Sequence, residues 1–129
     1  MVSECVSFLL IRDEQILLEK RADDKVSDPS LIAIPGGHIE SGESQLEALI
    51  RELKEELDVV PDSHHYLCSL YHPTDELQLI HYYVIPSWTG EIKSLEAAAV
   101  FWHDMQNAPV DVAADGVAVS EYLRVYSSL

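Results

Sequence analysis

The chain has 129 residues, of which 47% are hydrophobic and 24% charged, proportions that are typical of a folded domain and argue against a disordered chain. The length predicts one domain, residues 1–129, whose core is large enough to fold without disulfide bonds. The 23 acidic and 8 basic side chains give a formal net charge of -15, which argues against DNA or RNA as a partner, because polyanion binding depends on lysine and arginine.

The apolar runs and the cysteines indicate the cellular compartment of the protein. No stretch approaches the ~18 consecutive apolar residues of a membrane-spanning helix, and Arg12 and Asp13 interrupt the first apolar run. Cys5 and Cys68 form no CxxC pair, and we expect both to be buried and reduced. These features predict a cytoplasmic protein that does not enter membranes.

Two strands joined by a turn are predicted at the start of the chain. Residues 2–11 and 16–19 are largely apolar and flank a polar turn at residues 12–15, which indicates a β-hairpin. Residues 23–29 are polar and contain a proline, which is typical of a loop. A short apolar run at residues 31–34 follows this loop.

A helix and further strands follow, and a second helix ends the pattern. The helices are predicted at residues 44–57 and 115–126, and the strands at residues 66–71, 77–85 and 100–103. Strands that alternate with helices in this order predict an α/β/α sandwich, in which a mixed β-sheet is flanked by helices on both sides.

Residues 44–57 give the clearest helical pattern in the sequence. Residues 41–44 supply candidate N-caps, and Pro61 lies shortly after the predicted end. The apolar residues recur at helical spacing, and they predict one buried stripe made of Leu46, Leu49, Ile50, Leu53 and Leu57.

Three carboxylates share one side of this helix, beside the apolar stripe. Glu52, Glu55 and Glu56 are spaced i, i+3 and i+4, and like charges at that spacing repel one another. A hard divalent cation would offset the repulsion, because Mg²⁺ prefers carboxylate oxygens. The alternative interpretation is a solvated acidic face with Arg51 and Lys54 as partial partners.

The residues before the helix favour the metal interpretation. Pro35-Gly36-Gly37 predicts a turn at which the backbone can approach a ligand closely. Because only a short loop separates this turn from the helix, a backbone carbonyl and the carboxylates can converge on one cation.

Residues 37–59 resemble the Nudix box, whose family pattern is GX5EX7REUXEEXGU with U an aliphatic residue. Gly37, Glu43 and the run RELKEELDV at residues 51–59 match every specified position except one, because Asp58 stands where the family has glycine. We expect Asp58 to close the helix in a left-handed conformation, which aspartate tolerates better than most residues.

The resemblance implies the Nudix fold and a hydrolase that cleaves a nucleoside-diphosphate linkage with Mg²⁺, or Mn²⁺ in its place. By position, Glu52, Glu55 and Glu56 resemble the family's metal ligands, together with the carbonyl of Gly36. Glu52, or a nearby acid such as Glu96, would deprotonate the attacking water, and Glu96 is a further candidate ligand.

The same resemblance gives a structural role to two charged residues. Arg51 resembles the family arginine that pairs with Glu43 and holds the loop against the helix, which makes both residues part of the catalytic set. The alternative is an ordinary surface ion pair.

Beyond the box the chain resembles the short MutT-like branch of the family. This likeness makes Arg21 a phosphate contact and Asp115 a reader of the base edge, with Gly37 as a third substrate contact. The alternatives are that Arg21 is a solvated strand end and that Asp115 is only an N-cap. Ile34 stands where an aromatic residue would favour an oxidised guanine.

Three functions stay open at this point, all with a small nucleotide as partner and with a monomer or homodimer as the assembly. The first is a nucleoside triphosphate pyrophosphohydrolase that releases a nucleoside monophosphate and pyrophosphate. The second is a hydrolase of another diphosphate, such as ADP-ribose or a nucleotide sugar. The third is a non-catalytic nucleotide-sensing module, against which the complete set of three helix carboxylates argues.

Overall fold

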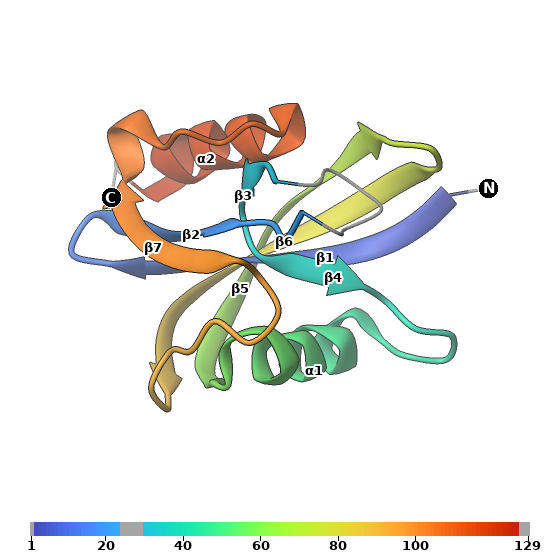
Figure 1. Ribbon diagram of the computed structural model, residues 1–129, viewed down its shortest axis with the longest axis horizontal. Helices are drawn as coiled ribbons and strands as arrows, with labels where there is room; N and C mark the ends of the chain where they lie inside the picture. The colour runs from blue at the N-terminus through green and yellow to red at the C-terminus, as the bar shows by residue number, and fades with distance from the viewer. Residues whose placement is uncertain (1, 24–29, 127–129) are drawn as a thin grey trace.

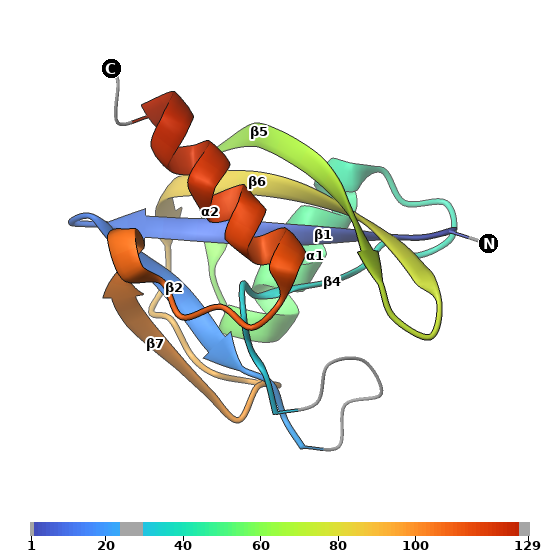
Figure 2. The same ribbon diagram turned by 90° about the horizontal axis from the view of Figure 1, so that it is seen from above.

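The computed structural model describes residues 2–23 and 30–126, and it confirms the α/β/α sandwich. A mixed sheet forms the middle layer, with helix α1 (Gln45–Leu57) on one face and helix α2 (Ala113–Tyr126) on the other (Figure 1). Viewed from above, α2 crosses in front of β1 and β6, while α1 lies behind them (Figure 2). Within the described ranges, no helix is long and apolar enough to cross a membrane.

The predicted strands are all present, several with longer bounds. The strands are β1 (Val2–Arg12), β2 (Gln15–Lys20), β3 (Ile32–Ala33), β4 (Gly36–His38), β5 (Val60–Pro73), β6 (Leu77–Thr89) and β7 (Ala99–Asp104), followed by a 3-10 turn, Met105–Asn107. The prediction for β5 was six residues long, whereas the strand has 14. It was too short because β5 is an edge strand with exposed polar residues such as His64 and His65, which give no apolar run.

The sheet order places the two adjacent glycines beside the central strand. The strands are ordered β3-β2-β1-β6-β5, with β1 and β6 parallel and their other neighbours antiparallel. β2 pairs with β1 only at Ile11 and Arg12, so most of that edge of β1 is left for another strand. β4 takes this edge, with Gly36 opposite Ser7 and Gly37 opposite Val6.

Side chains of the central strands alternate between two cores, one under each helix. Phe8 and Leu10 of β1 pack with α1, whereas Leu9 packs in the cluster that includes the α2 residue Ala118. This alternation follows from the two-residue period of a strand. Both cysteines are free thiols, but Cys68, which was predicted to be buried, is only half-buried.

The predicted stripe on α1 was wrong at one edge. Leu46 and Ile50 are 41% and 43% exposed, whereas Glu52 and Glu56 are each only 7% exposed. The helix is therefore turned so that these two carboxylates, rather than Leu46 and Ile50, face the sheet. Gly37 of β4 has no side chain, and this leaves the space in which the Glu52 carboxylate lies against the strand.

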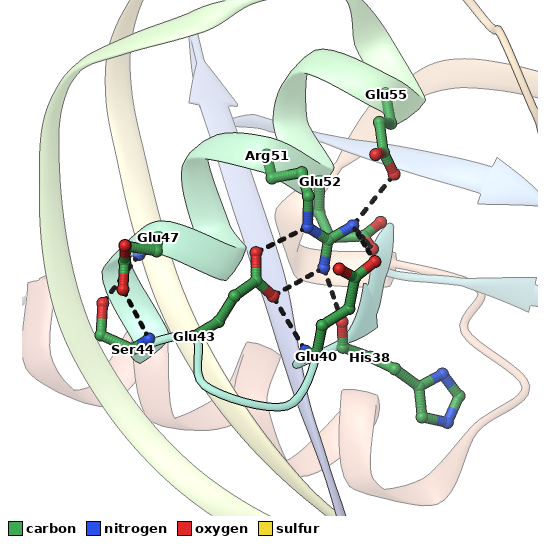
Figure 3. A network of polar contacts seen from close by, with 8 residues as sticks. All are labelled: His38, Glu40, Glu43, Ser44, Glu47, Arg51, Glu52 and Glu55. Carbon is green, nitrogen blue, oxygen red and sulfur yellow. Dashed lines mark hydrogen bonds and ion pairs between the residues drawn. The ribbon is translucent and has the colours of Figure 1, made fainter.

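Both ends of α1 are fixed by local hydrogen bonds. The Ser44 hydroxyl accepts from the Glu47 N–H at 3.1 Å, and the Ser44 N–H donates to the Glu47 carboxylate at 2.9 Å, which makes a capping box (Figure 3). Asp58 ends the helix in the left-handed conformation, with φ 58° and ψ 39°, as predicted. Its carboxylate lies 2.8 Å from Lys54 Nζ and 3.3 Å from Lys93 Nζ, and these ion pairs offset its unfavourable position at the helix C-terminus.

Candidate active site

A cavity of about 410 Å³ is lined by residues from α1, β4 and the first turn of α2. Most of the residues singled out from the sequence line this cavity, namely Arg21, Gly36, Gly37, Glu52, Glu56, Glu96 and Asp115. Glu43, Arg51 and Glu55 do not line it, and they lie on the neighbouring surface of α1 and the preceding loop. The structure thus brings together residues that are up to 94 positions apart, from Arg21 to Asp115.

Two glycines allow α1 and β1 to approach the β4 backbone closely. A Cβ atom at Gly37 would collide with the carboxylate of Glu52, and a Cβ atom at Gly36 would collide with the carbonyl oxygen of Val6. Neither contact leaves room for a side chain. The Glu52 carboxylate therefore lies directly against the backbone of Gly37, in the cavity that the Gly36 backbone also lines.

Arg51 connects the loop before α1 to the acids on the helix (Figure 3). Its Nε and Nη2 donate to the two carboxylate oxygens of Glu43 at 2.7 and 2.9 Å, a bidentate pair. Nη2 also donates to the carbonyl oxygen of His38 at 2.9 Å. Nη1 donates to Glu52 at 2.8 Å and to Glu55 at 3.0 Å. Arg51 thereby fixes the loop and one cavity carboxylate with a single guanidinium group.

These contacts shift the ionisation of the acids in opposite directions. The hydrogen bonds from Arg51 lower the pKa of Glu43 to about 2. Burial raises the pKa of Glu52, the hydrogen bond from Arg51 lowers it, and the nearby charges of Glu55 and Glu96 raise it further, with a net increase. Glu52 is thus a buried carboxylate surrounded by other acids, an environment that a bound cation would stabilise.

The segment after β6 carries Glu96 to the cavity. The N–H groups of Lys93 and Leu95 donate to the carbonyls of Leu57 and Glu56 at 2.9 and 3.1 Å, so this segment satisfies the last turn of α1. Its far end is held by a hydrogen bond of 3.0 Å from the Ala98 N–H to the Lys20 carbonyl. Between these anchors, Glu96 lines the cavity together with Glu56.

The donor chemistry of this wall fits a hard divalent cation. Glu52, Glu56 and Glu96 offer carboxylate oxygens, and the Gly36 backbone lies in the same lining; oxygen donors of this kind are what Mg²⁺ prefers. In the described part of the chain, no three acidic, histidine or cysteine side chains already form a closed metal site. The carboxylate of Glu55 points to Arg51, so it would have to leave Arg51 to reach an ion.

Arg21 and Asp115, two of the residues predicted to contact the nucleotide, also line the cavity. Asp115 is 3% exposed, and its carboxylate accepts from the Ile34 N–H at 2.9 Å and from the Tyr82 hydroxyl at 2.7 Å. Because α2 begins at Ala113, the alternative of Asp115 as an N-cap is wrong. Arg21 lies 3.3 Å from Glu19, which is buried and orients the guanidinium, so Arg21 is not a freely solvated strand end.

Several cavity residues were missed by the sequence interpretation, among them Glu19, His72 and Gln78. Glu19 and Gln78 carried a signal, because each is a polar residue that directly adjoins the apolar run of its strand. Gln78 also lies an even number of positions from Ile80 and Tyr82, so it is on the same inward face of the strand. His72 lies in the edge strand β5, where no pattern distinguished it from the other histidines.

Comparison with known proteins agrees with this geometry. The model of the NUDIX domain matches residues 3–123. The CTP pyrophosphohydrolase of Escherichia coli K12 is 30% identical over 106 residues, which cover 81% of this chain and 78% of that protein. The 8-oxo-dGTP diphosphatase of the same organism is 29% identical over 105 residues, covering 79% and 81%.

A solved structure agrees in fold over nearly the whole chain. The MutT NUDIX hydrolase from Burkholderia pseudomallei superposes with a TM-score of 0.85 at 23% identity, covering 94% of this chain and 98% of that one. These likenesses agree with the matched domain and with the motif at residues 37–59. The chain belongs to the NUDIX domain family, as a hydrolase of diphosphate bonds in its MutT-like branch.

Proposed function

We propose that the protein is a Mg²⁺-dependent nucleoside triphosphate pyrophosphohydrolase that releases a nucleoside monophosphate and pyrophosphate. The observation that carries the proposal is the charge of the cavity. Its lining contains the three acids Glu52, Glu56 and Glu96 together with Arg21. A polyanionic triphosphate would be repelled by these acids, so a divalent cation has to accompany it.

The chain's own groups divide into two sets in this proposal. Glu52, Glu55, Glu56, Glu96 and the Gly36 carbonyl would hold the ion, which would neutralise the diphosphate and lower the pKa of a coordinated water. Arg51 and Glu43 keep the loop and Glu52 in position, because both oxygens of Glu43 and one oxygen of Glu52 accept from Arg51.

Two roles complete the reaction. Either Glu52 or Glu96 accepts the proton of the attacking water, since both line the cavity. Arg21 donates hydrogen bonds to the phosphate oxygens, with Glu19 orienting it at 3.3 Å. Asymmetric loss of activity in Glu52→Gln and Glu96→Gln, with one variant far slower at saturating Mg²⁺, assigns the proton acceptor.

The base is proposed to be one with an exocyclic amino group, cytosine above all. Asp115 is a carboxylate and can only accept hydrogen bonds, so it favours an amino group over the carbonyl of uracil or thymine. The likeness to a CTP pyrophosphohydrolase supports this preference. Ile34, which is aliphatic and 3% exposed, offers no aromatic ring for an oxidised guanine.

A panel of substrates with Mg²⁺ tests the proposal. Purified protein is incubated with CTP, UTP, ATP, GTP, 8-oxo-dGTP and ADP-ribose, and the products are separated by anion-exchange chromatography. We expect CMP and pyrophosphate from CTP, with the highest kcat/KM of the panel. Release of AMP and ribose 5-phosphate from ADP-ribose, with all triphosphates intact, would replace this proposal by the second function. Nucleotide binding without any hydrolysis would favour the sensing module.

A further inference from the structure

Gln78 lies in the cavity on the same strand that carries a partner of Asp115. In β6, the residues Gln78, Ile80 and Tyr82 alternate with their neighbours and so share one face of the sheet. Tyr82 donates its hydroxyl to Asp115 at 2.7 Å, and both Gln78 and Ile80 line the cavity. This row of side chains runs along one face of β6 from Tyr82, the partner of Asp115, to Gln78.

The side chain of Gln78 is largely buried, and its carboxamide makes no hydrogen bond to the residues that the structure describes. Gln78 is 7% exposed, and no hydrogen-bond partner of its side-chain amide occurs among residues 2–23 and 30–126. In those same ranges, no polar side-chain atom is both sealed from solvent and without a partner, so the amide opens into the cavity it lines. A carboxamide that faces the cavity and has no partner among the described residues can hydrogen-bond a ligand bound there.

We propose that Gln78 is a specificity-determining residue that hydrogen-bonds the edge of the substrate's base; this inference rests on the proposed nucleotide substrate. The carboxamide has an NH₂ donor and a carbonyl acceptor, whereas the carboxylate of Asp115 has acceptors alone. Together they match a base that presents an amino group next to a ring nitrogen or carbonyl acceptor, as cytosine does. Asp115 takes the amino hydrogen, and Gln78 donates to the adjacent acceptor.

The test compares Gln78→Met with the wild type, because methionine has a similar volume and lacks the amide. Binding of CMP and of ribose 5-phosphate, which has no base, is measured by titration calorimetry. We expect Gln78→Met to weaken CMP binding roughly 3- to 10-fold, the range for one neutral hydrogen bond, and to leave ribose 5-phosphate unchanged. Gln106→Met, which makes the same chemical change at an exposed glutamine away from this cavity, should bind both ligands as the wild type does.

The outcomes separate this inference from the proposed catalysis, since neither ligand is turned over. One outcome is weaker CMP binding by Gln78→Met together with no triphosphate hydrolysis by the wild type. This outcome would contradict the proposed function and support the role of Gln78. Equal weakening of both ligands, an unchanged affinity for CMP, or no CMP binding by the wild type overturns the inference.

A second measurement covers the case in which Gln78→Met unfolds. The side-chain NH₂ resonances of Gln78 in the wild type, assigned through the bonded network of the labelled chain, should shift when CMP is added and stay in place with ribose 5-phosphate. Resonances that do not respond to CMP overturn the inference.

Discussion

A methyl group added at Gly37 would occupy the space of the Glu52 carboxylate, because all three nearest atoms to that position belong to the carboxyl group of Glu52. Non-bonded carbon atoms stay about 3.5–4.0 Å apart, so in Gly37→Ala the carboxylate has to move by more than ~1 Å. The obstructing group is the end of a flexible side chain, and its displacement need not disturb the backbone. Gly37→Ala should therefore harm catalysis more than stability.

The expected loss of activity can be estimated from how strongly a reaction rate depends on the position of the reacting groups. A misplacement of about 1 Å near reacting groups costs on the order of 100-fold in rate, which corresponds to about 2.7 kcal/mol of transition-state stabilisation. Glu52 also accepts from Arg51 at 2.8 Å, and a displaced carboxylate would lose this contact as well. We therefore expect kcat/KM to fall about 100-fold.

The assay is pyrophosphate release from CTP, measured beside thermal unfolding of the same samples. Gly36→Ala is the contrasting variant, because its methyl group would meet the Val6 carbonyl and the Ser7 backbone, which cannot turn aside. That variant should lose about 1–3 kcal/mol of stability, whereas Gly37→Ala should unfold near the wild-type temperature. Gly37→Ala with full activity, or with the larger loss of stability of the two, would refute the reasoning.

Three further substitutions test the contacts that hold α1 and the loop before it in place beside the cavity. Ser44→Ala removes the cap of α1 and should cost about 1 kcal/mol, seen as a fall of about 3–5 °C in Tm; an unchanged Tm would contradict the capping box. Because Arg51 lowers the pKa of Glu43 to about 2, the stability of this pair is fully present above the ordinary pKa of a glutamate and is lost as the pH falls toward 2. Glu43→Gln should thus be less stable than the wild type at neutral pH, and urea unfolding at a series of pH values should show this difference shrinking below pH ~4.5. Asp58→Gly restores the family residue, relieves a left-handed aspartate and loses two exposed ion pairs; we expect unchanged kcat/KM, and a large gain in activity would mean that Asp58 impairs the site.

The sequence predicted best those features that depend on neighbours along the chain. The start of α1 at Ser44 and its end at Asp58 were anticipated, because capping bonds join residues within a few positions of one another. The burial of α1 was predicted less well. Leu46 and Ile50 have the helical spacing of core residues, but the helix turns Glu52 toward β4, a tertiary contact with no trace in the periodicity.

Residues of the candidate site could be named from the sequence where the chain resembles the family, but their positions in space could not be predicted. The carboxylates of α1 could be found from their spacing and the resemblance, but the position of Glu96 depends on hydrogen bonds from Lys93 and Leu95 to the end of α1. Gln78 reaches the cavity through the parallel pairing of β6 with β1, which joins residues 75 positions apart in the chain. Pairings of that range are set by the whole sheet and not by any local pattern.

The most direct test of the account is the dependence of CTP hydrolysis on Mg²⁺ in the wild type and in Glu56→Gln, measured as pyrophosphate released. Glu56 is 7% exposed and lines the acidic wall of the cavity, whereas Glu91 is exposed away from it and gives the matched control, Glu91→Gln. The account predicts hydrolysis only with the metal, a loss of at least about 100-fold in Glu56→Gln, and wild-type rates in Glu91→Gln. Hydrolysis that persists in EDTA, or full activity in Glu56→Gln, would contradict it.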